Sequence, residues 1–193
     1  MNRIIGIIVS TVIILFSTVS FAFAEELHWG FKKATDGNQI EISSELETML
    51  AKYDAIYRGD PQAKTIYLTF DNGYENGFTE RILDALKEED VPATFFLTGH
   101  YVTSASDLVK RMVKDGHIIG NHSDKHPNMA RLSEAQMLTE WQNFDKKLKE
   151  VTGLERTYYT RPPEGVYNET LLAVGAKNDY RHIFWSIAFK DWE

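Results

Sequence analysis

Hydrophobic residues follow two alternating spacings from residue 65 onward, and these spacings predict strands that alternate with helices. Short β-branched and aromatic runs predict strands over residues 65–70, 93–97, 117–120, 158–161 and 182–188. Apolar residues at helical spacing predict helices over residues 79–87, 106–115, 133–152 and 168–177 between them. This alternation is typical of an α/β protein with a parallel sheet, either open or closed as a barrel.

Residues 25–64 form a polar lead-in that contains one further predicted helix. The helix starts at Ser44-Glu45-Leu46-Glu47, which matches the capping-box pattern. Apolar residues then recur at helical spacing, at Leu46, Met49, Leu50, Tyr53 and Tyr57. We expect this helix to pack against the main body rather than to bind a ligand.

Residues 1–24 carry the features of a secretory signal. The basic Arg3 precedes an apolar run from Ile4 to Phe16, and Ala22-Phe23-Ala24 supplies the small residues that signal peptidase accepts. The alternative is a retained membrane anchor, because the uncharged run from Ile4 to Ala24 is long enough to span a bilayer. We expect cleavage after Ala24 and export of the protein out of a bacterial cytoplasm.

The composition excludes several classes of protein. Hydrophobic residues make up 43% of the chain, which is enough for a packed core. With 28 acidic and 21 basic residues and a net charge of −7, the chain lacks the basic face of a nucleic-acid-binding protein. The absence of cysteine excludes disulfides, a cysteine nucleophile and a thiolate metal site.

Two histidines, His122 and His126, follow the predicted strand over residues 117–120. Their spacing brings two imidazole rings together on a helix or a tight loop, and neutral imidazole is a common ligand of zinc and similar cations. A surface pair or a satisfied pair is the alternative. Carboxyl ends of parallel strands meet at one edge of a sheet, so the expected closeness to Asp71 favours a metal site. We expect His117 and His182 to pack in or beside strands, and His100 not to contact a substrate.

Asp71, Arg161 and Gly165 belong to the same expected edge. Asp71 ends a buried strand, where partial desolvation suits a general base, although Asp-Asn-Gly alternatively indicates only a turn. Arg161 precedes Pro162-Pro163, which holds its backbone extended; its guanidinium either pairs with Asp71 or is an ordinary surface group. Gly165 permits a turn whose backbone amides can face an oxyanion.

Several segments together resemble the motifs of the polysaccharide deacetylases, the NodB-homology enzymes of carbohydrate esterase family 4. They lie in family order within residues 65–193: Thr69-Phe70-Asp71-Asn72-Gly73, His122-Ser123-x-x-His126-Pro127, Arg161-Pro162-Pro163-x-Gly165 and Trp185-Ser186-Ile187-Ala188-Phe189-Lys190-Asp191-Trp192. The resemblance implies a distorted (β/α) barrel and metal-dependent removal of N-acetyl groups from an aminosugar polymer.

The resemblance also implies roles for individual residues. Asp71 is the base that activates water, and Arg161 positions it. His122 and His126 are ligands of a divalent metal, with zinc as the expected ion. Asn72 stands where the family has a second aspartate as the third ligand, and an uncharged amide oxygen there should weaken metal binding or shift the cation preference.

Other implied roles fall on the third and fourth motifs. The turn at Glu164 and Gly165 helps to hold the oxyanion through the Glu164 amide. Asp191 belongs to the network around a catalytic histidine, and Trp192 lies with the substrate.

The substrate expectation follows from a subgroup of the family. This subgroup deacetylates N-acetylmuramic acid on the way to the muramic δ-lactam of the spore cortex. The chain resembles it in the Asn-bearing first motif, in Arg-Pro-Pro and in the Trp-Ser-x-Ala-Phe-x-Asp-Trp stretch. Two lead-in segments resemble it as well: Trp29-Gly30-Phe31-Lys32-Lys33 and Lys52-Tyr53-Asp54-Ala55-Ile56. We therefore expect a peptidoglycan strand in the cell wall or spore envelope as substrate, with a chitin-like or N-acetylglucosamine glycan as the alternative. We also expect a monomer, no nucleic acid, and transient membrane contact through residues 1–24.

Family members continue past the fourth motif to a Leu-x-His motif whose histidine is the general acid, whereas no histidine follows His182 here. We therefore expect the domain over residues 65–193 to be truncated, its last strand to have an open edge, and its activity to be little or none. The alternatives are an inactive glycan- or metal-binding remnant and a membrane-tethered structural protein.

Overall fold

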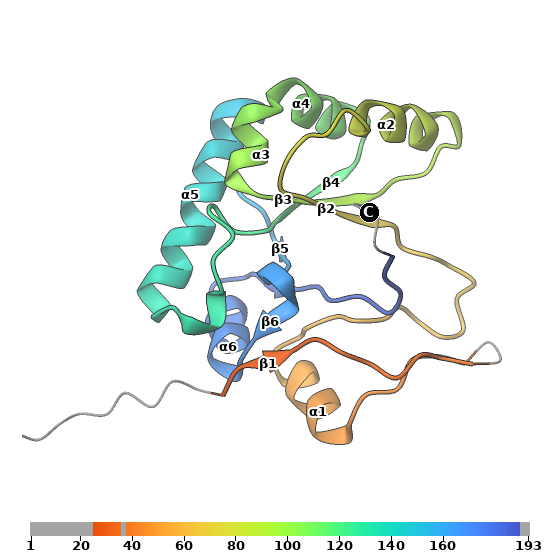
Figure 1. The fold of residues 1–193 in the computed structure, drawn as a ribbon, viewed down its shortest axis with the longest axis vertical. Helices are drawn as coiled ribbons and strands as arrows, with labels where there is room; N and C mark the ends of the chain where they lie inside the picture. The colour runs from red at the N-terminus through yellow and green to blue at the C-terminus, as the bar shows by residue number, and fades with distance from the viewer. Residues whose placement is uncertain (1–24, 36–37, 190–193) are drawn as a thin grey trace, which may run out of the picture.

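The sheet at the centre of the molecule carries the candidate site at one of its edges. The computed structural model describes residues 25–35 and 38–189. Within them, a five-stranded sheet has the order β2-β3-β4-β5-β7, and a two-stranded antiparallel sheet pairs β1 with β6 (Figure 1). The strands are β1 Leu27–His28, β2 Thr69–Asn72, β3 Thr94–Leu97, β4 Ile118–Asn121, β5 Tyr159–Thr160, β6 Val166–Tyr167 and β7 Arg181–His182.

All neighbours in the five-stranded sheet run parallel, as the alternating pattern predicts. The register pairs Asn72 with Leu97, Leu97 with Asn121, and Asn121 with Thr160. The carboxyl ends of these strands therefore meet at one edge, and the α/β prediction is confirmed. Among the described residues the sheet is open, because β2 and β7 are its two outer strands.

Helices connect the strands close to the predicted positions. Their bounds are α1 Ser44–Lys52, α2 Thr79–Glu88, α3 Gly99–Ser104, α4 Ser106–Lys114, α5 Glu134–Thr152 and α6 Glu169–Lys177, with short 3-10 turns at Met129–Arg131 and Pro163–Gly165. Helix α5 begins at a complete capping box between Ser133 and Gln136 and ends at Gly153, whose φ of 82° closes the helix in the left-handed region.

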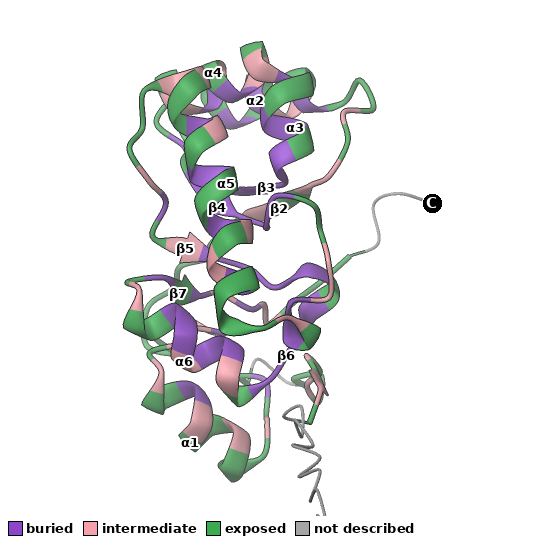
Figure 2. Ribbon diagram, turned by 90° about the vertical axis from the view of Figure 1, so that its left-hand side faces the viewer, coloured by how far each residue is buried: buried purple, intermediate pink, exposed green. Residues whose placement is uncertain are grey.

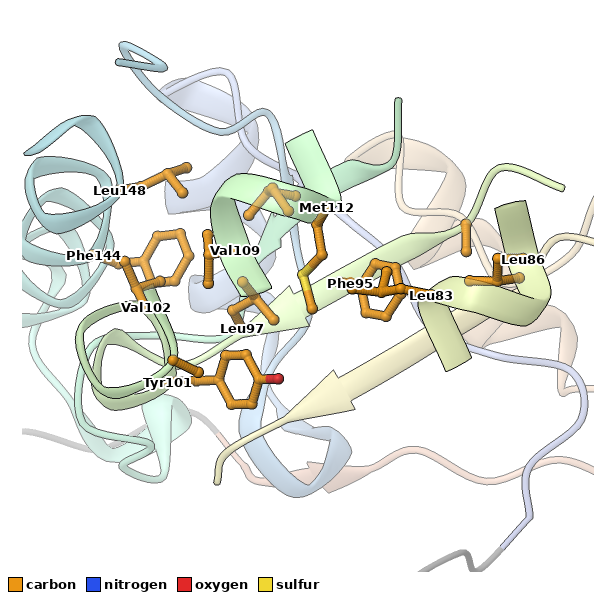
Figure 3. Close-up of a cluster of buried hydrophobic side chains, with 13 residues drawn as sticks. Leu83, Leu86, Phe95, Leu97, Tyr101, Val102, Val109, Met112, Phe144 and Leu148 are labelled. Atoms are coloured by element: carbon orange, nitrogen blue, oxygen red, sulfur yellow. The ribbon is translucent and has the colours of Figure 1, made fainter. Parts of the chain in front are cut away.

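One hydrophobic core lies between the sheet and helices α2 to α5 (Figure 3). Phe95 and Leu97 of β3 are fully buried there against helix residues such as Leu83, Met112 and Phe144. Figure 2 shows buried residues along the inner sides of these helices and exposed residues on their outer sides. This is the pattern expected for amphipathic helices that cover a buried parallel sheet.

A second core joins the lead-in to the end of the described chain. Leu50 and Tyr57 of the lead-in pack with Trp141 of α5, Leu171 of α6 and Phe184. The prediction that this helix packs against the main body is confirmed, although α1 ends at Lys52, before Tyr57.

Two predicted strands lie differently in the structure. Residues 65–68 precede β2, with Ile66 82% exposed and Tyr67 72% exposed, because pairing with β3 begins only at Thr69. The strand predicted over residues 182–188 is limited to β7.

The outer side of β7 is also not left open, contrary to expectation. Ile56 donates its N–H to the carbonyl of His182 at 2.9 Å and accepts from the N–H of Phe184 at 2.7 Å. The lead-in therefore bonds two of the backbone groups that an edge strand would expose, a contact that was not predicted from the sequence.

Three sets of predicted features lie outside the described residues: the signal segment over residues 1–24, Asp191 and Trp192. Within the part of the chain that is described, no helix combines the length and apolar composition needed to cross a bilayer.

Candidate active site

Asp71 and Arg161 form an ion pair at the carboxyl edge of the sheet. Nη1 of Arg161 donates to Oδ1 of Asp71 at 2.6 Å, and Nη2 donates to Oγ1 of Thr69 at 3.0 Å. The Arg161 side chain is only 4% exposed, whereas that of Asp71 is 38% exposed. The carboxylate is therefore oriented from the protein side and still accessible to solvent.

The guanidinium of Arg161 is held by further contacts. Its Nε donates to the carbonyl of Ile183 at 3.1 Å, and Nη2 donates to that of Phe184 at 3.3 Å. Its planar face lies 4.2 Å from the centre of the Phe96 ring. Burial lowers the pKa of Arg161, while the neighbouring Asp71 carboxylate raises it.

His122 and His126 converge on the tight loop after β4. Their ring centres lie 4.9 Å apart with 69° between the planes. His122 is buried, and its Nδ1 lies 2.9 Å from the carbonyl oxygen of Arg161, which leaves Nε2 for another partner. Burial lowers the pKa of His122, which favours the neutral imidazole that binds metal ions.

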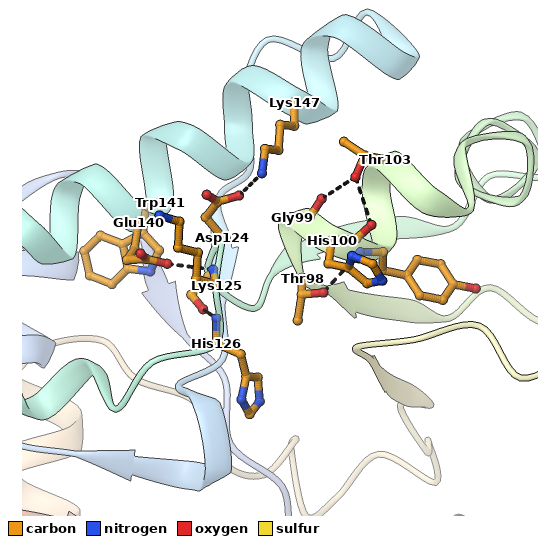
Figure 4. Close-up of polar contacts among 12 residues, drawn as sticks. Thr98, Gly99, His100, Thr103, Asp124, Lys125, His126, Glu140, Trp141 and Lys147 are labelled. Atoms are coloured by element: carbon orange, nitrogen blue, oxygen red, sulfur yellow. Dashed lines mark hydrogen bonds and ion pairs between the residues drawn. The ribbon is translucent and has the colours of Figure 1, made fainter.

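The histidine loop is anchored to helix α5 (Figure 4). Lys147 donates to the buried carboxylate of Asp124 at 2.5 Å, and the N–H of Lys125 donates to Glu140 at 2.8 Å. The N–H of His126 donates to Oγ of Ser123 at 2.9 Å. Both Ser123 and His126 have φ values in the left-handed region, 66° and 57°, so this loop stores strain that its anchors must offset.

Asn72 is the remaining candidate ligand. Its Oδ1 is buried and has no hydrogen-bond partner in the described structure. Such an orphaned acceptor is costly unless a ligand or water satisfies it. Among the described residues, no group of three or more His, Cys, Asp or Glu side chains could hold a metal ion, so the Asn72 amide is the candidate for a third ligand beside the two histidines. The donor set of two imidazoles and one oxygen fits a divalent cation.

The turn after Arg161 brings Glu164 and Gly165 to the same region. Glu164 is exposed and has φ of 57°, and Gly165 has φ of 67°. The N–H of Gly165 already donates to the carbonyl of Pro162 at 3.0 Å, so this amide is engaged within the turn. The Glu164 amide therefore stays as the oxyanion candidate of this pair.

Trp29 and Thr69 lie in segments that carry the family resemblance, but the contacts they make at the site were not predicted from the sequence. The indole N–H of Trp29 donates to the carbonyl of Trp185 at 2.9 Å, its ring stacks on Phe184 at 4.5 Å, and its backbone N–H donates to Gly165 at 2.8 Å. These contacts span up to 156 residues, and no local pattern signals them. The predictions that His117 and His182 pack in the interior are confirmed, since both are buried.

The parallel α/β fold and the residues at the carboxyl edge of its sheet are those of a class of hydrolases. The family model for polysaccharide deacetylase matches residues 58–183, and the chain belongs to that family. Bacillus subtilis peptidoglycan-N-acetylmuramic acid deacetylase PdaA is 43% identical over 88% of this chain. The solved structure of PdaA, which is described as a family 4 carbohydrate esterase, matches with a TM-score of 0.85 over 88% of this chain and 72% of its own. A family 4 carbohydrate esterase from Bacillus anthracis is also 43% identical, with a TM-score of 0.79 over 88% of this chain and 77% of its own.

The relatives are longer than this chain. An uncharacterized 30.6 kDa protein of Geobacillus stearothermophilus is 52% identical over 92% of the chain, which covers 68% of its length. The chain covers 64% of the Bacillus subtilis deacetylase sequence.

Proposed function

We propose that this protein is a metal-dependent hydrolase that removes N-acetyl groups from peptidoglycan, at N-acetylmuramic acid. One observation carries the proposal: Arg161 contacts both halves of the site. Its side chain donates to Asp71 at 2.6 Å, and its backbone carbonyl lies 2.9 Å from Nδ1 of His122. A single residue thus holds both a candidate base and a candidate metal ligand in place.

His122, His126 and Asn72 are the residues that would hold the metal. The free Nε2 of His122, the exposed position of His126 and the orphaned Oδ1 of Asn72 support this assignment. A divalent cation bound there polarises a carbonyl group and acidifies water. Because Asn72 contributes no charge, we expect weaker binding than with a carboxylate in its place.

The remaining steps fall to the protein side chains and backbone. Asp71 takes a proton from water, whose oxygen bonds to the acetyl carbon, while Arg161 keeps the carboxylate in place. The Glu164 amide donates to the carbonyl oxygen as negative charge develops on it. The carbon–nitrogen bond then breaks, the proton held by Asp71 passes to the amine nitrogen, and acetate leaves.

Two relatives that are named as peptidoglycan deacetylases support peptidoglycan as the substrate class. The Bacillus subtilis relative is named a peptidoglycan-N-acetylmuramic acid deacetylase, and a Bacillus cereus relative that is 35% identical is a peptidoglycan-N-acetylglucosamine deacetylase. The Asn-bearing motif at Asp71-Asn72 favours the muramic acid substrate by its resemblance to that subgroup.

Export through residues 1–24 agrees with a cell-wall substrate and is part of the same proposal. Replacing Ala24 with leucine should block processing, so the uncut precursor should accumulate in cells and be visible as a mass difference. Processing at Ala24 that is unaffected by the substitution would contradict the proposed cleavage site.

Acetate release tests the function directly. The purified protein, loaded with zinc, is incubated with N-acetylated peptidoglycan glycan strands, and acetate is measured by NMR. We expect a low but measurable release, in line with the expectation of little activity for this chain. The release should stop in Asp71→Asn, which keeps the shape of the side chain but removes its basicity. Equal acetate release by the two proteins, or none above a protein-free control, would overturn the proposal.

A further inference from the structure

Tyr74 and His100 form an exposed pair of rings beside the candidate active site. Tyr74 is 80% exposed, and its ring centre lies 4.7 Å from that of His100, with 51° between the planes. Tyr74 follows β2, and His100 lies in α3 directly after β3. Because β2 and β3 are adjacent parallel strands, both rings stand at the same edge of the sheet as Asp71.

The backbone on both sides of Tyr74 is fixed. Before it, the carbonyl of Gly73 accepts from Oγ1 of the buried Thr98 at 3.2 Å. After it, the Glu75 carboxylate accepts from the hydroxyl of Tyr101 at 2.6 Å and from the N–H of Gly77 at 2.7 Å. The exposed ring is therefore presented by an ordered loop rather than by a free one.

The same anchors hold His100. Thr98 caps α3, since its Oγ1 accepts from the N–H of Tyr101 at 3.2 Å (Figure 4). Buried Gly99, whose N–H donates to the carbonyl of Ser123 at 3.1 Å, joins this loop to the histidine loop. A ligand that contacts these two rings thus loses little binding free energy to ordering of the protein.

The chemistry of the pair suits a pyranose. A sugar ring presents a face of C–H bonds with hydroxyl groups at its rim. The tyrosine ring offers a flat apolar face with negative potential, and the imidazole offers a donor and an acceptor that can bond a hydroxyl. Tyr74 is three residues from Asp71, at most about 11 Å along an extended chain. A glycan with one sugar at Asp71 therefore has a neighbouring sugar within reach of Tyr74.

We propose that Tyr74 and His100 form a platform that binds a second pyranose of the N-acetylated glycan, next to the sugar that is deacetylated. This rests on the proposed deacetylase function for the identity of the glycan. It changes the expectation that His100 does not contact the substrate. The tyrosine supplies stacking area, and His100 fixes the ring and bonds a hydroxyl of the bound sugar.

Binding measurements test the platform independently of turnover. The probe is a soluble oligosaccharide of alternating N-acetylglucosamine and N-acetylmuramic acid, and its Kd is measured by calorimetry. Tyr74→Ala and His100→Ala should each raise Kd by about tenfold, which corresponds to about 1.4 kcal/mol. Tyr74→Phe should keep the affinity of the original protein, because stacking does not need the hydroxyl. Tyr158→Ala is the matched control, since Tyr158 is 60% exposed but precedes β5, at the opposite end of the strands.

The outcomes separate this proposal from the proposed function. Selective weakening by Tyr74→Ala and His100→Ala supports the platform even if no acetate is released. An unchanged Kd in Tyr74→Ala, equal weakening by Tyr158→Ala, or no binding by the original protein overturns it. Acetate release at the same rate by Tyr74→Ala under subsaturating glycan would also overturn the platform while leaving the deacetylase function in place.

Discussion

The guanidinium of Arg161 donates to Oδ1 of Asp71 at 2.6 Å, across 90 residues of sequence. The same guanidinium also donates to two backbone carbonyls, those of Ile183 and Phe184. The orientation of Asp71 therefore depends on a segment that follows β7, far from the motif that contains the aspartate.

Replacing Arg161 with lysine should separate charge from geometry. Arg161→Lys keeps the positive charge but cannot bond Asp71, Thr69 and both carbonyls at once. We expect acetate release to fall about 100-fold, the size of effect that a misplacement of about 1 Å produces. The measurement is kcat/KM on the glycan strands.

Arg181→Lys is the control for this substitution. Arg181 lies in β7 of the same sheet, but its side chain is 43% exposed and pairs with Asp54 outside the candidate site. We expect kcat/KM to stay unchanged there. A similar loss in both variants would mean that the effect of Arg161→Lys is on folding.

Trp29 should act as a positioning residue through Phe184 and Trp185. Trp29→Ala removes both the stacking on Phe184 and the hydrogen bond to the Trp185 carbonyl, so the segment that holds Arg161 loses its support. We expect kcat to fall about tenfold or more. The NMR signal of the Arg161 Nε–H, which reports its bond to Ile183, should shift without any substrate present.

Two further variants make this prediction specific. Trp29→Phe keeps the stacking and should recover most of the activity. Phe31→Ala removes a neighbouring ring, 6.3 Å from Trp29, and should leave the Arg161 signal in place. An unmoved Nε–H signal in Trp29→Ala would contradict a positioning role.

His182 should make the fold sensitive to acid. It is fully buried, neither ring nitrogen has a hydrogen-bond partner within the described residues, and burial lowers its pKa to about 3. The unfolded chain binds this proton near pH 6.5, so stability from the neutral ring is present above that value and is lost as pH falls toward 3. Between pH 6.5 and pH 5 we expect His182 alone to lower the free energy of unfolding by about 2 kcal/mol.

The comparison of His182→Leu with the original protein isolates this effect. Urea unfolding at several pH values should show a shallower decline below pH 6.5 in the variant. His28→Gln, at an exposed position, should decline as the original protein does. Parallel curves for His182→Leu and the original protein would rule out His182 as the source.

Local signals in the sequence predict much of the fold. Helix α5 could be placed because Ser133, Gln136 and Gly153 define its ends through contacts within a few residues. Helix α3 was missed although Thr98 caps it, because its six residues are too few to show a helical period. Residues 65–68 have strand composition but lie outside the sheet, since the partner strand β3 begins opposite Thr69.

Some features of the candidate site could be predicted from the sequence, and others could not. Asp71, His122 and Arg161 were predicted because each closes a strand of a parallel sheet, and such ends meet at one edge. The contacts of Trp29 and the bridge from Ile56 to β7 depend on tertiary packing across more than a hundred residues, which leaves no periodic pattern. The engaged amide of Gly165 likewise became visible only in the folded turn.

The proposed reaction depends on the binding of a metal ion by His122 and His126. Zinc binding by the purified protein is measured by calorimetry, with bound zinc counted by mass spectrometry. We predict one zinc per chain, loss of binding in His126→Ala and His122→Ala, and tighter binding in Asn72→Asp, while His28→Ala binds as the original protein does. Zinc bound with unchanged stoichiometry and affinity in a folded His126→Ala protein would contradict this assignment.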